Sequence, residues 1–219
     1  MWGSDEFAFH RPNHVDDRSK VALDVQLLAV LLSLPTTHRV HEAIVEFNQA
    51  NTDSSDVPEH VEVVMCKSAL EWLLEIGTSA NALVNALEGS LSNVTPTACD
   101  GPLRETWMQR WQHQTRPLLA WAKDFCAVRG TSAHGMSRMP SVWGNHQHLA
   151  FIAILFPLLL KVVLANDGLL EMDDIDIEHL RRIEQYLMHD PFDHDWDEDN
   201  PHPWADVASH ARLVARAYL

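Results

Sequence analysis

Apolar side chains recur at steps of three and four residues along most of this chain. That spacing places them on one face of a helix. The alternation of β-branched and polar residues that predicts strands does not recur at regular intervals, so we expect an all-α protein. The predicted helices run from Val21 to Leu34, His38 to Asn48, Val61 to Leu87, Pro102 to Arg129, Asn145 to Leu164, Asp174 to Met188 and Trp204 to Tyr218.

Glycine and proline set the expected interruptions. Gly77 weakens the third predicted helix without being expected to end it, because apolar residues continue the pattern to Leu87. Pro117 falls inside the fourth, which predicts a kink there. We expect that helix to run out at Arg129 and Gly130, and residues 166–168, Asn-Asp-Gly, to end the next one in a left-handed turn.

The longest apolar run, Leu149 to Leu160, is interrupted by Pro157 and followed by Lys161. A membrane-spanning helix needs about 20 apolar residues, so this run predicts a buried core helix and no membrane contact. The first six residues are acidic and lack the pattern of a signal peptide. Three cysteines without a C-x-x-C pair give no disulfide framework. We therefore expect a soluble, cytoplasmic protein with reduced thiols: Cys66, Cys99 and Cys126.

Length and composition predict one main domain. The chain has 219 residues, of which 46% are hydrophobic, enough for a sizeable core. We expect an N-terminal segment over residues 1–19 and a helical bundle over 20–190. Residues 191–219 should form an acidic loop and a short C-terminal helix packed on the same domain.

The net charge of −15 excludes a general nucleic-acid binder with a broad basic face. The acidic residues are concentrated after Asp173, above all in residues 190–199. The segment from Arg104 to Arg138, in contrast, contains six basic residues and only two acidic ones. The sequence is locally basic in the segment that also carries the strongest candidate site.

That candidate site is the segment from Phe125 to Gly135, in which His134 follows Arg129 by five positions. A guanidinium binds phosphate oxygens bidentately, and an imidazole titrates near neutral pH, so the pair suits phosphodiester chemistry. On a straight helix the two side chains would project about 140° apart, and Gly130 gives the chain a means to unwind and bring them together. The same pattern also fits a helix-end arginine with a capping histidine.

The segment resembles the R-x4-6-H motif of HEPN domains, here Arg129-x4-His134 followed by Gly135. Two flanking segments are similar to the family as well. Residues 67–74, Lys-Ser-Ala-Leu-Glu-Trp-Leu-Leu, look like its Ala-Leu-Glu-x-Leu-Leu helix, and the apolar helix from His148 to Lys161 lies downstream of the motif as expected. The resemblance covers residues 60–190.

The resemblance implies an antiparallel helical bundle that forms a homodimer, with two motif copies across a shared cleft. It implies a metal-independent endoribonuclease without a cofactor, in a toxin–antitoxin, phage-defence or RNA-processing context, whose partners are RNA and a cognate antitoxin or regulatory protein. Arg129 would stabilise the pentacoordinate phosphate and His134 would act as general acid or base, leaving a 2′,3′-cyclic phosphate. Other members are non-catalytic interaction modules, which is the alternative reading.

Three further residues complete the expected site. Active HEPN members often have a polar residue directly after the arginine, whereas this chain has Gly130. Thr131 and Ser132 are the candidates to supply that hydrogen bond to the substrate. Arg138 is a candidate second phosphate contact, or else a solvated loop residue.

Weaker patterns carry alternatives. Trp143 either stacks on a base or packs beneath the loop. The pairs His146/His148 and His10/His14 have ligand-like spacing but no diagnostic partner, so we expect no metal. A metal-dependent hydrolase using residues 190–202 is the least supported reading. Asp195, Asp197, Asp199 and Asp206 fall at positions of an EF-hand loop, but Asn200 replaces the turn glycine.

Overall fold

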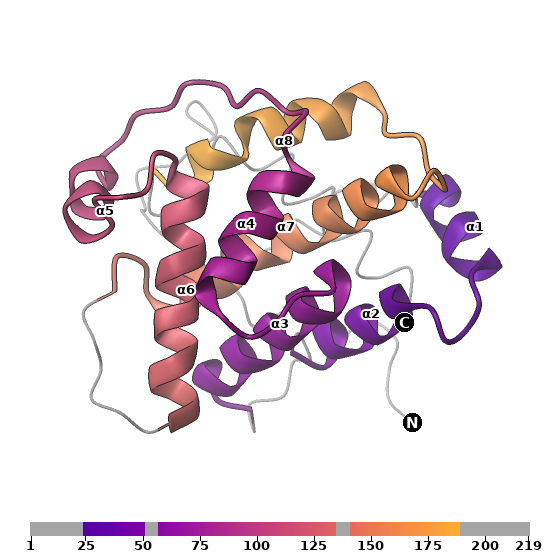
Figure 1. Ribbon diagram of the computed structural model, residues 1–219, viewed down its shortest axis with the longest axis horizontal. Coiled ribbons are helices and arrows are strands. Elements are labelled where there is room, and N and C mark those ends of the chain that lie inside the picture. Colours follow the sequence, from indigo (N-terminus) through magenta and orange to yellow (C-terminus); the bar gives the residue numbers. More distant parts are fainter. Residues whose placement is uncertain (1–23, 51–56, 135–140, 189–219) are drawn as a thin grey trace, which may run out of the picture.

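The computed structural model describes residues 24–50, 57–134 and 141–188, with only the backbone described for residues 131–134. Over these ranges it contains eight α-helices and no strand (Figure 1). The prediction of an all-α protein is confirmed for this part of the chain. The helices are α1 Val25–Ser33, α2 Arg39–Ala50, α3 Glu59–Leu74, α4 Ala80–Ser90, α5 Arg104–Arg110, α6 Pro117–His134, α7 Asn145–Asn166 and α8 Asp174–Tyr186.

The apolar helix α7 forms the centre of the fold. In Figure 1 it lies between α8 above and α3 below, while α6 runs steeply at the left of the view. Nearly every residue from His148 to Leu164 is buried. By length and composition α7 alone among the described helices could span a membrane, but most of it lies inside the protein. The prediction of a buried core helix is therefore confirmed.

Aromatic rings fill the space where α6 meets α7. Trp121 stacks on Phe125 with ring centroids 5.0 Å apart, and its edge meets Phe151 of α7 at 4.7 Å. Such pairs contribute about 0.5–1.5 kcal/mol each beyond the area they bury. In the middle of α7, Phe156 stacks on Phe47 of α2 at 4.1 Å. These contacts fix α6, and with it the candidate site, against the core.

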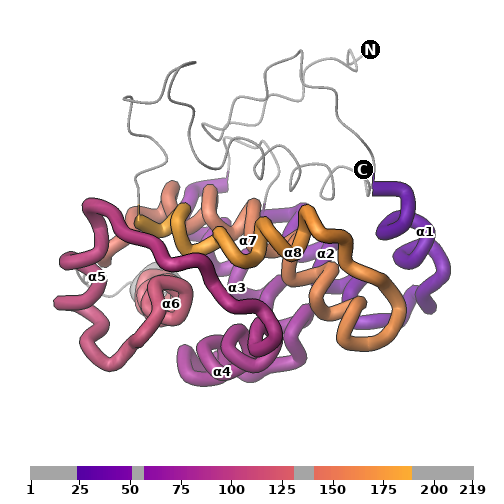
Figure 2. The backbone as a smooth tube through the Cα atoms, turned by 90° about the horizontal axis from the view of Figure 1, so that it is seen from above, coloured from indigo at the N-terminus to yellow at the C-terminus, as the bar shows by residue number. Residues whose placement is uncertain are grey.

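The predicted helix from Val61 to Leu87 is two helices, so this expectation is wrong. α3 ends at Leu74 because Glu75 adopts a left-handed conformation with φ of 52°. α4 begins after Ser79, whose hydroxyl accepts a hydrogen bond from the amide of Ala82 at 3.1 Å. A left-handed residue followed by a side-chain cap stops one helix and starts another, which the apolar spacing alone does not reveal. Figure 2 shows α4 lying apart from α3.

The predicted kink at Pro117 is also wrong, because Pro117 is the first residue of α6 and α5 is a separate helix. Proline is tolerated at a first helical position, where its missing N–H has no partner to lose.

α6 then continues through Gly130 to His134 instead of ending at Arg129. The end of α7 follows the prediction, since Gly168, two residues after the end of the helix, adopts a φ of +72°.

Residues 1–19 and 191–219, including the predicted helix from Trp204 to Tyr218, lie outside the described residues. The described helices lie between residues 25 and 186.

Candidate functional site

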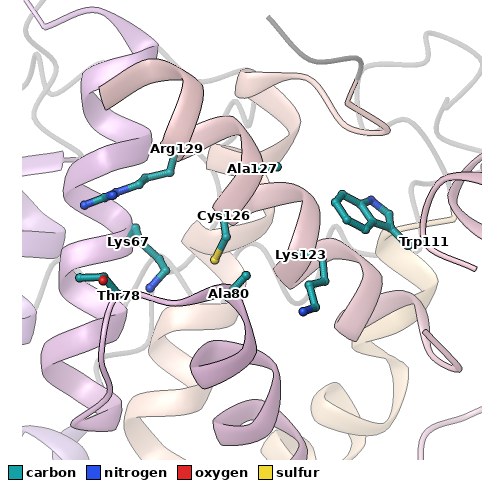
Figure 3. A pocket seen from close by; sticks show the side chains of 8 residues that line it. All are labelled: Lys67, Thr78, Ala80, Trp111, Lys123, Cys126, Ala127 and Arg129. Carbon is teal, nitrogen blue, oxygen red and sulfur yellow. The ribbon is translucent and has the colours of Figure 1, made fainter. Parts of the chain in front are cut away.

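Arg129 lines a cavity of about 370 Å³ between α3, the start of α4 and α6. Figure 3 shows its guanidinium directed toward α3. Two more basic residues, Lys67 of α3 and Lys123 of α6, line the same cavity, together with Thr78, Trp111 and Cys126. The remaining lining residues are the alanines Ala80 and Ala127. No carboxylate is among the described residues that line this cavity.

The local sequence of α6 explains why three of these side chains meet. Lys123, Cys126 and Arg129 follow one another at three-residue steps and therefore share one face of the helix. Phe125 and Val128 lie outside this face and are buried in the core. The polar face of α6 is thus turned toward α3 and α4.

The three cations differ in their partners. The Lys67 side chain is only 1% exposed, and its ammonium donates to Glu71 at 2.7 Å. Lys123 donates to the neutral amide oxygen of Asn81. Arg129 has a buried Nε without a hydrogen-bond acceptor, and no carboxylate of the described residues forms an ion pair with it. By contrast, Arg39 pairs with Asp167 at 2.8 Å and Arg116 with Glu184 at 2.8 Å.

The thiol of Cys126 lies among these charges. Burial raises its pKa above the ordinary value, and the negative charge of Glu71 acts in the same direction. The positive charges of Lys67, Lys123 and Arg129 oppose that rise. All three cations therefore act on one point inside the cavity.

His134 is the last residue of α6, and no break separates it from Arg129. The expected unwinding at Gly130 does not occur, because a single helical glycine costs only about 0.5–1 kcal/mol relative to alanine and is tolerated. Five residues of regular helix leave the two Cα–Cβ directions about 140° apart. The backbone of α6 therefore keeps Arg129 and His134 of one chain on different faces of the helix. Thr131 and Ser132 belong to the same last turn, and Arg138 lies outside the described residues.

Asp124, which sequence reasoning missed, connects the middle of α6 to Trp111, which precedes this helix, and to the residues that lead into α7. Its carboxylate accepts hydrogen bonds from Trp111 Nε1 at 2.9 Å and from the amides of Val142 and Trp143 at 3.0 and 3.3 Å. The sequence feature that could have indicated the role of Asp124 is the position of a charged residue directly before a phenylalanine in an apolar helix. Asp124 positions the cavity wall, through Trp111, and the approach to α7.

His148 and Trp143 are both buried in the core. His148 is fully buried beside the rings of Trp121, Phe125 and Trp143. Trp143 is buried and donates from Nε1 to the carbonyl of Leu187 at 3.2 Å, so it packs in the core and is not exposed for base stacking. Among the described residues no three His, Cys, Asp or Glu side chains are grouped to hold a metal ion. His10, His14 and the acidic residues 190–206 lie outside those residues.

Comparison of the chain with protein-family models, curated proteins and solved structures finds no match.

Proposed function

We propose that this protein is a metal-independent endoribonuclease of HEPN type, with Arg129 and His134 as its catalytic residues. The observation that carries the proposal is the position of Arg129 in a cavity with two other cations and without a carboxylate partner among the described residues. A guanidinium that is not neutralised by a carboxylate is suited to phosphate, whose oxygens it binds in a bidentate manner.

The proposed reaction uses the RNA 2′-hydroxyl as nucleophile. His134 takes the proton of this hydroxyl or delivers one to the leaving group. The 2′-oxygen bonds to phosphorus, the bond to the 5′-oxygen breaks, and the protonated 5′-hydroxyl leaves. The products are a 2′,3′-cyclic phosphate and a 5′-hydroxyl end. Arg129 stabilises the negative charge that accumulates on the phosphate oxygens in the transition state.

The course of α6 bears on how the site is assembled. Because Arg129 and His134 project about 140° apart on an unbroken helix, one straight α6 does not present both to one phosphate. We therefore place Arg129 of one protomer and His134 of another in each site of a homodimer built from antiparallel helical bundles. Thr131, Ser132 and Arg138 complete the contacts to RNA.

The resemblance to HEPN domains also defines the proposed setting. The protein would act in the cytoplasm in a toxin–antitoxin, phage-defence or RNA-processing system. A net charge of −15 speeds encounter with a basic antitoxin or regulatory protein.

The direct test is incubation of the purified protein with total RNA in EDTA. We expect cleavage that leaves cyclic phosphate ends, and a loss of about 100-fold or more in His134→Ala and Arg129→Gln. Arg181→Gln is the matched control, because Arg181 is half exposed on α8 and remote in sequence from the motif. Absence of cleavage, or unchanged cleavage by His134→Ala, would overturn the proposal.

A second candidate function is a non-catalytic helical dimer that binds a partner protein. The divergence of Arg129 and His134 on the unbroken α6 favours it, as does Gly130 at the position where active members often carry a polar residue. A stable stoichiometric partner from affinity purification, together with no RNA cleavage by the free protein, would support this reading over the first.

A further inference from the structure

The cavity beside α6 contains more positive charge than its surroundings neutralise. Lys67, Lys123 and Arg129 contribute three positive charges. Among the described residues, Glu71 is the one carboxylate that pairs with any of them, and it pairs with Lys67. The partner of Lys123 is the uncharged Asn81. Two positive charges are therefore left without a carboxylate among the described residues.

Burial makes this imbalance costly for an empty cavity. Taking a cation out of water is unfavourable unless an anion or several acceptors replace the water. Lys67 is 1% exposed and has three N–H donors, of which Glu71 accepts one. The Nε–H of Arg129 is buried without an acceptor. Both side chains thus have donors available for a bound anion.

The size and lining of the cavity define the anion further. A volume of about 370 Å³ falls within the range of about 300–1,000 Å³ that is usual for small-molecule sites. The Thr78 hydroxyl can donate one more hydrogen bond, and Figure 3 shows it near the end of the Lys67 side chain. A phosphomonoester carries about −1.5 to −2 charges at neutral pH, which matches the two positive charges in excess. A phosphodiester carries one.

We infer that this cavity binds a phosphomonoester, with Lys67, Lys123 and Arg129 as the charged contacts and Thr78 as a hydrogen-bond donor. The phosphomonoester belongs either to a free phosphorylated nucleoside or to the terminal phosphate of an RNA chain. Binding does not require that the protein cleave RNA. Because Arg129 belongs to both sites, a bound phosphomonoester occupies the guanidinium that the proposed cleavage uses.

Calorimetric titration of the full-length protein tests the binding. Inorganic phosphate and adenosine 5′-monophosphate should bind, adenosine should not, and the dinucleotide TpT, with one internal phosphodiester, should bind at least about 10-fold more weakly than the monophosphate. An RNA oligonucleotide with and without a 5′-phosphate distinguishes the two sources. Equal binding of adenosine and its monophosphate, equal binding of TpT, or no saturable binding of phosphate below about 10 mM overturns the inference.

Variants locate the site. Lys123→Gln and Arg129→Gln should each raise the Kd for the monophosphate by about 10-fold or more, because each removes a charge-assisted hydrogen bond. Arg181→Gln, which removes the same charge from a half-exposed position on α8, should leave the Kd unchanged. If all three variants raise the Kd equally, binding depends on the net charge of the protein and not on this cavity.

Thiol labelling of the unaltered protein gives a test that does not depend on any variant folding. Burial raises the pKa of both the Cys126 and the Cys99 thiols, but Cys126 lies among three cations and one carboxylate, whereas two cations and two carboxylates act on Cys99. The ratio of the labelling rate with negatively charged iodoacetate to the rate with neutral iodoacetamide should therefore be higher at Cys126 than at Cys99. Added phosphate should slow the labelling of Cys126 and leave that of Cys99 unchanged. An equal reagent preference at the two thiols, or no protection by phosphate, contradicts the inference.

Discussion

The carboxylate of Asp124 lies 3.3 Å from Nε2 of His148, and both side chains are buried where α6 meets α7. Asp124 also accepts hydrogen bonds from the backbone amides of Val142 and Trp143. One carboxylate thus connects α6 to the residues that lead into α7, across the segment that follows His134. This contact holds the middle of α6 to the start of α7.

The unfolding free energy should fall as the pH drops below the ordinary histidine pKa of 6.5. Burial lowers the pKa of His148 in the folded protein, although Asp124 opposes this. Below pH 6.5 the unfolded chain therefore binds a proton that the folded chain excludes, at a cost of at most about 1.4 kcal/mol per pH unit.

Urea unfolding of the wild type and His148→Gln, from about pH 7.5 to about pH 5.5, isolates this contribution, because other titrating groups are present in both proteins. Glu184, whose pKa is raised by burial, acts in the opposite direction and cancels in the difference. The stability of His148→Gln should depend less on pH than that of the wild type. Equal slopes would contradict the assignment.

Gly130→Ala should stabilise the protein by about 0.5–1 kcal/mol and preserve any RNA cleavage. Gly130 lies inside α6, and a Cβ there would meet no atom within 4 Å. Gly168→Ala is the matched control. Its space is also open, but its φ of +72° disfavours a side chain, so this variant should lose about 1 kcal/mol or more. Thermal unfolding measures both, and a destabilised Gly130→Ala would show that α6 needs to unwind there.

Lys161→Met should destabilise the protein by about 3–5 kcal/mol. The ammonium of Lys161 is 2% exposed and lies 2.6 Å from the carboxylates of both Asp24 and Asp176, which it joins across α1, α7 and α8. Its removal leaves two carboxylates without this cation. Arg181→Ala breaks a half-exposed pair with Glu178 and should cost less than about 1 kcal/mol. Similar losses in the two variants, measured by urea unfolding, would show that the buried cluster contributes no more than a surface pair.

Helical spacing was sufficient to predict the all-α class, the burial of α7 and the left-handed end at Gly168. It did not predict the break after α3, because Glu75 takes a left-handed conformation that its residue type does not favour. Nor did it predict the course of α6, since the local cost of Gly130 is small beside the packing of Phe125 and Val128 in the core.

The candidate site was predictable only in part. Arg129 was found from its motif, but its neighbour Lys67 lies 62 positions earlier in the sequence, and nothing local indicates that α3 packs against α6. Lys123 carried a usable signal, because Lys123, Cys126 and Arg129 share one helix face. The combined charge of the cavity follows from tertiary packing alone.

The most direct test of the central claim is a complementation assay with two inactive variants. Arg129→Ala retains His134, and His134→Ala retains Arg129. If each site takes one residue from either protomer, mixing and exchanging the two variants restores RNA cleavage in EDTA, because one site of each mixed dimer contains both residues. We expect each variant alone to be inactive and the mixture to cleave RNA at a substantial fraction of the wild-type rate. A mixture that forms mixed dimers and remains inactive would contradict it.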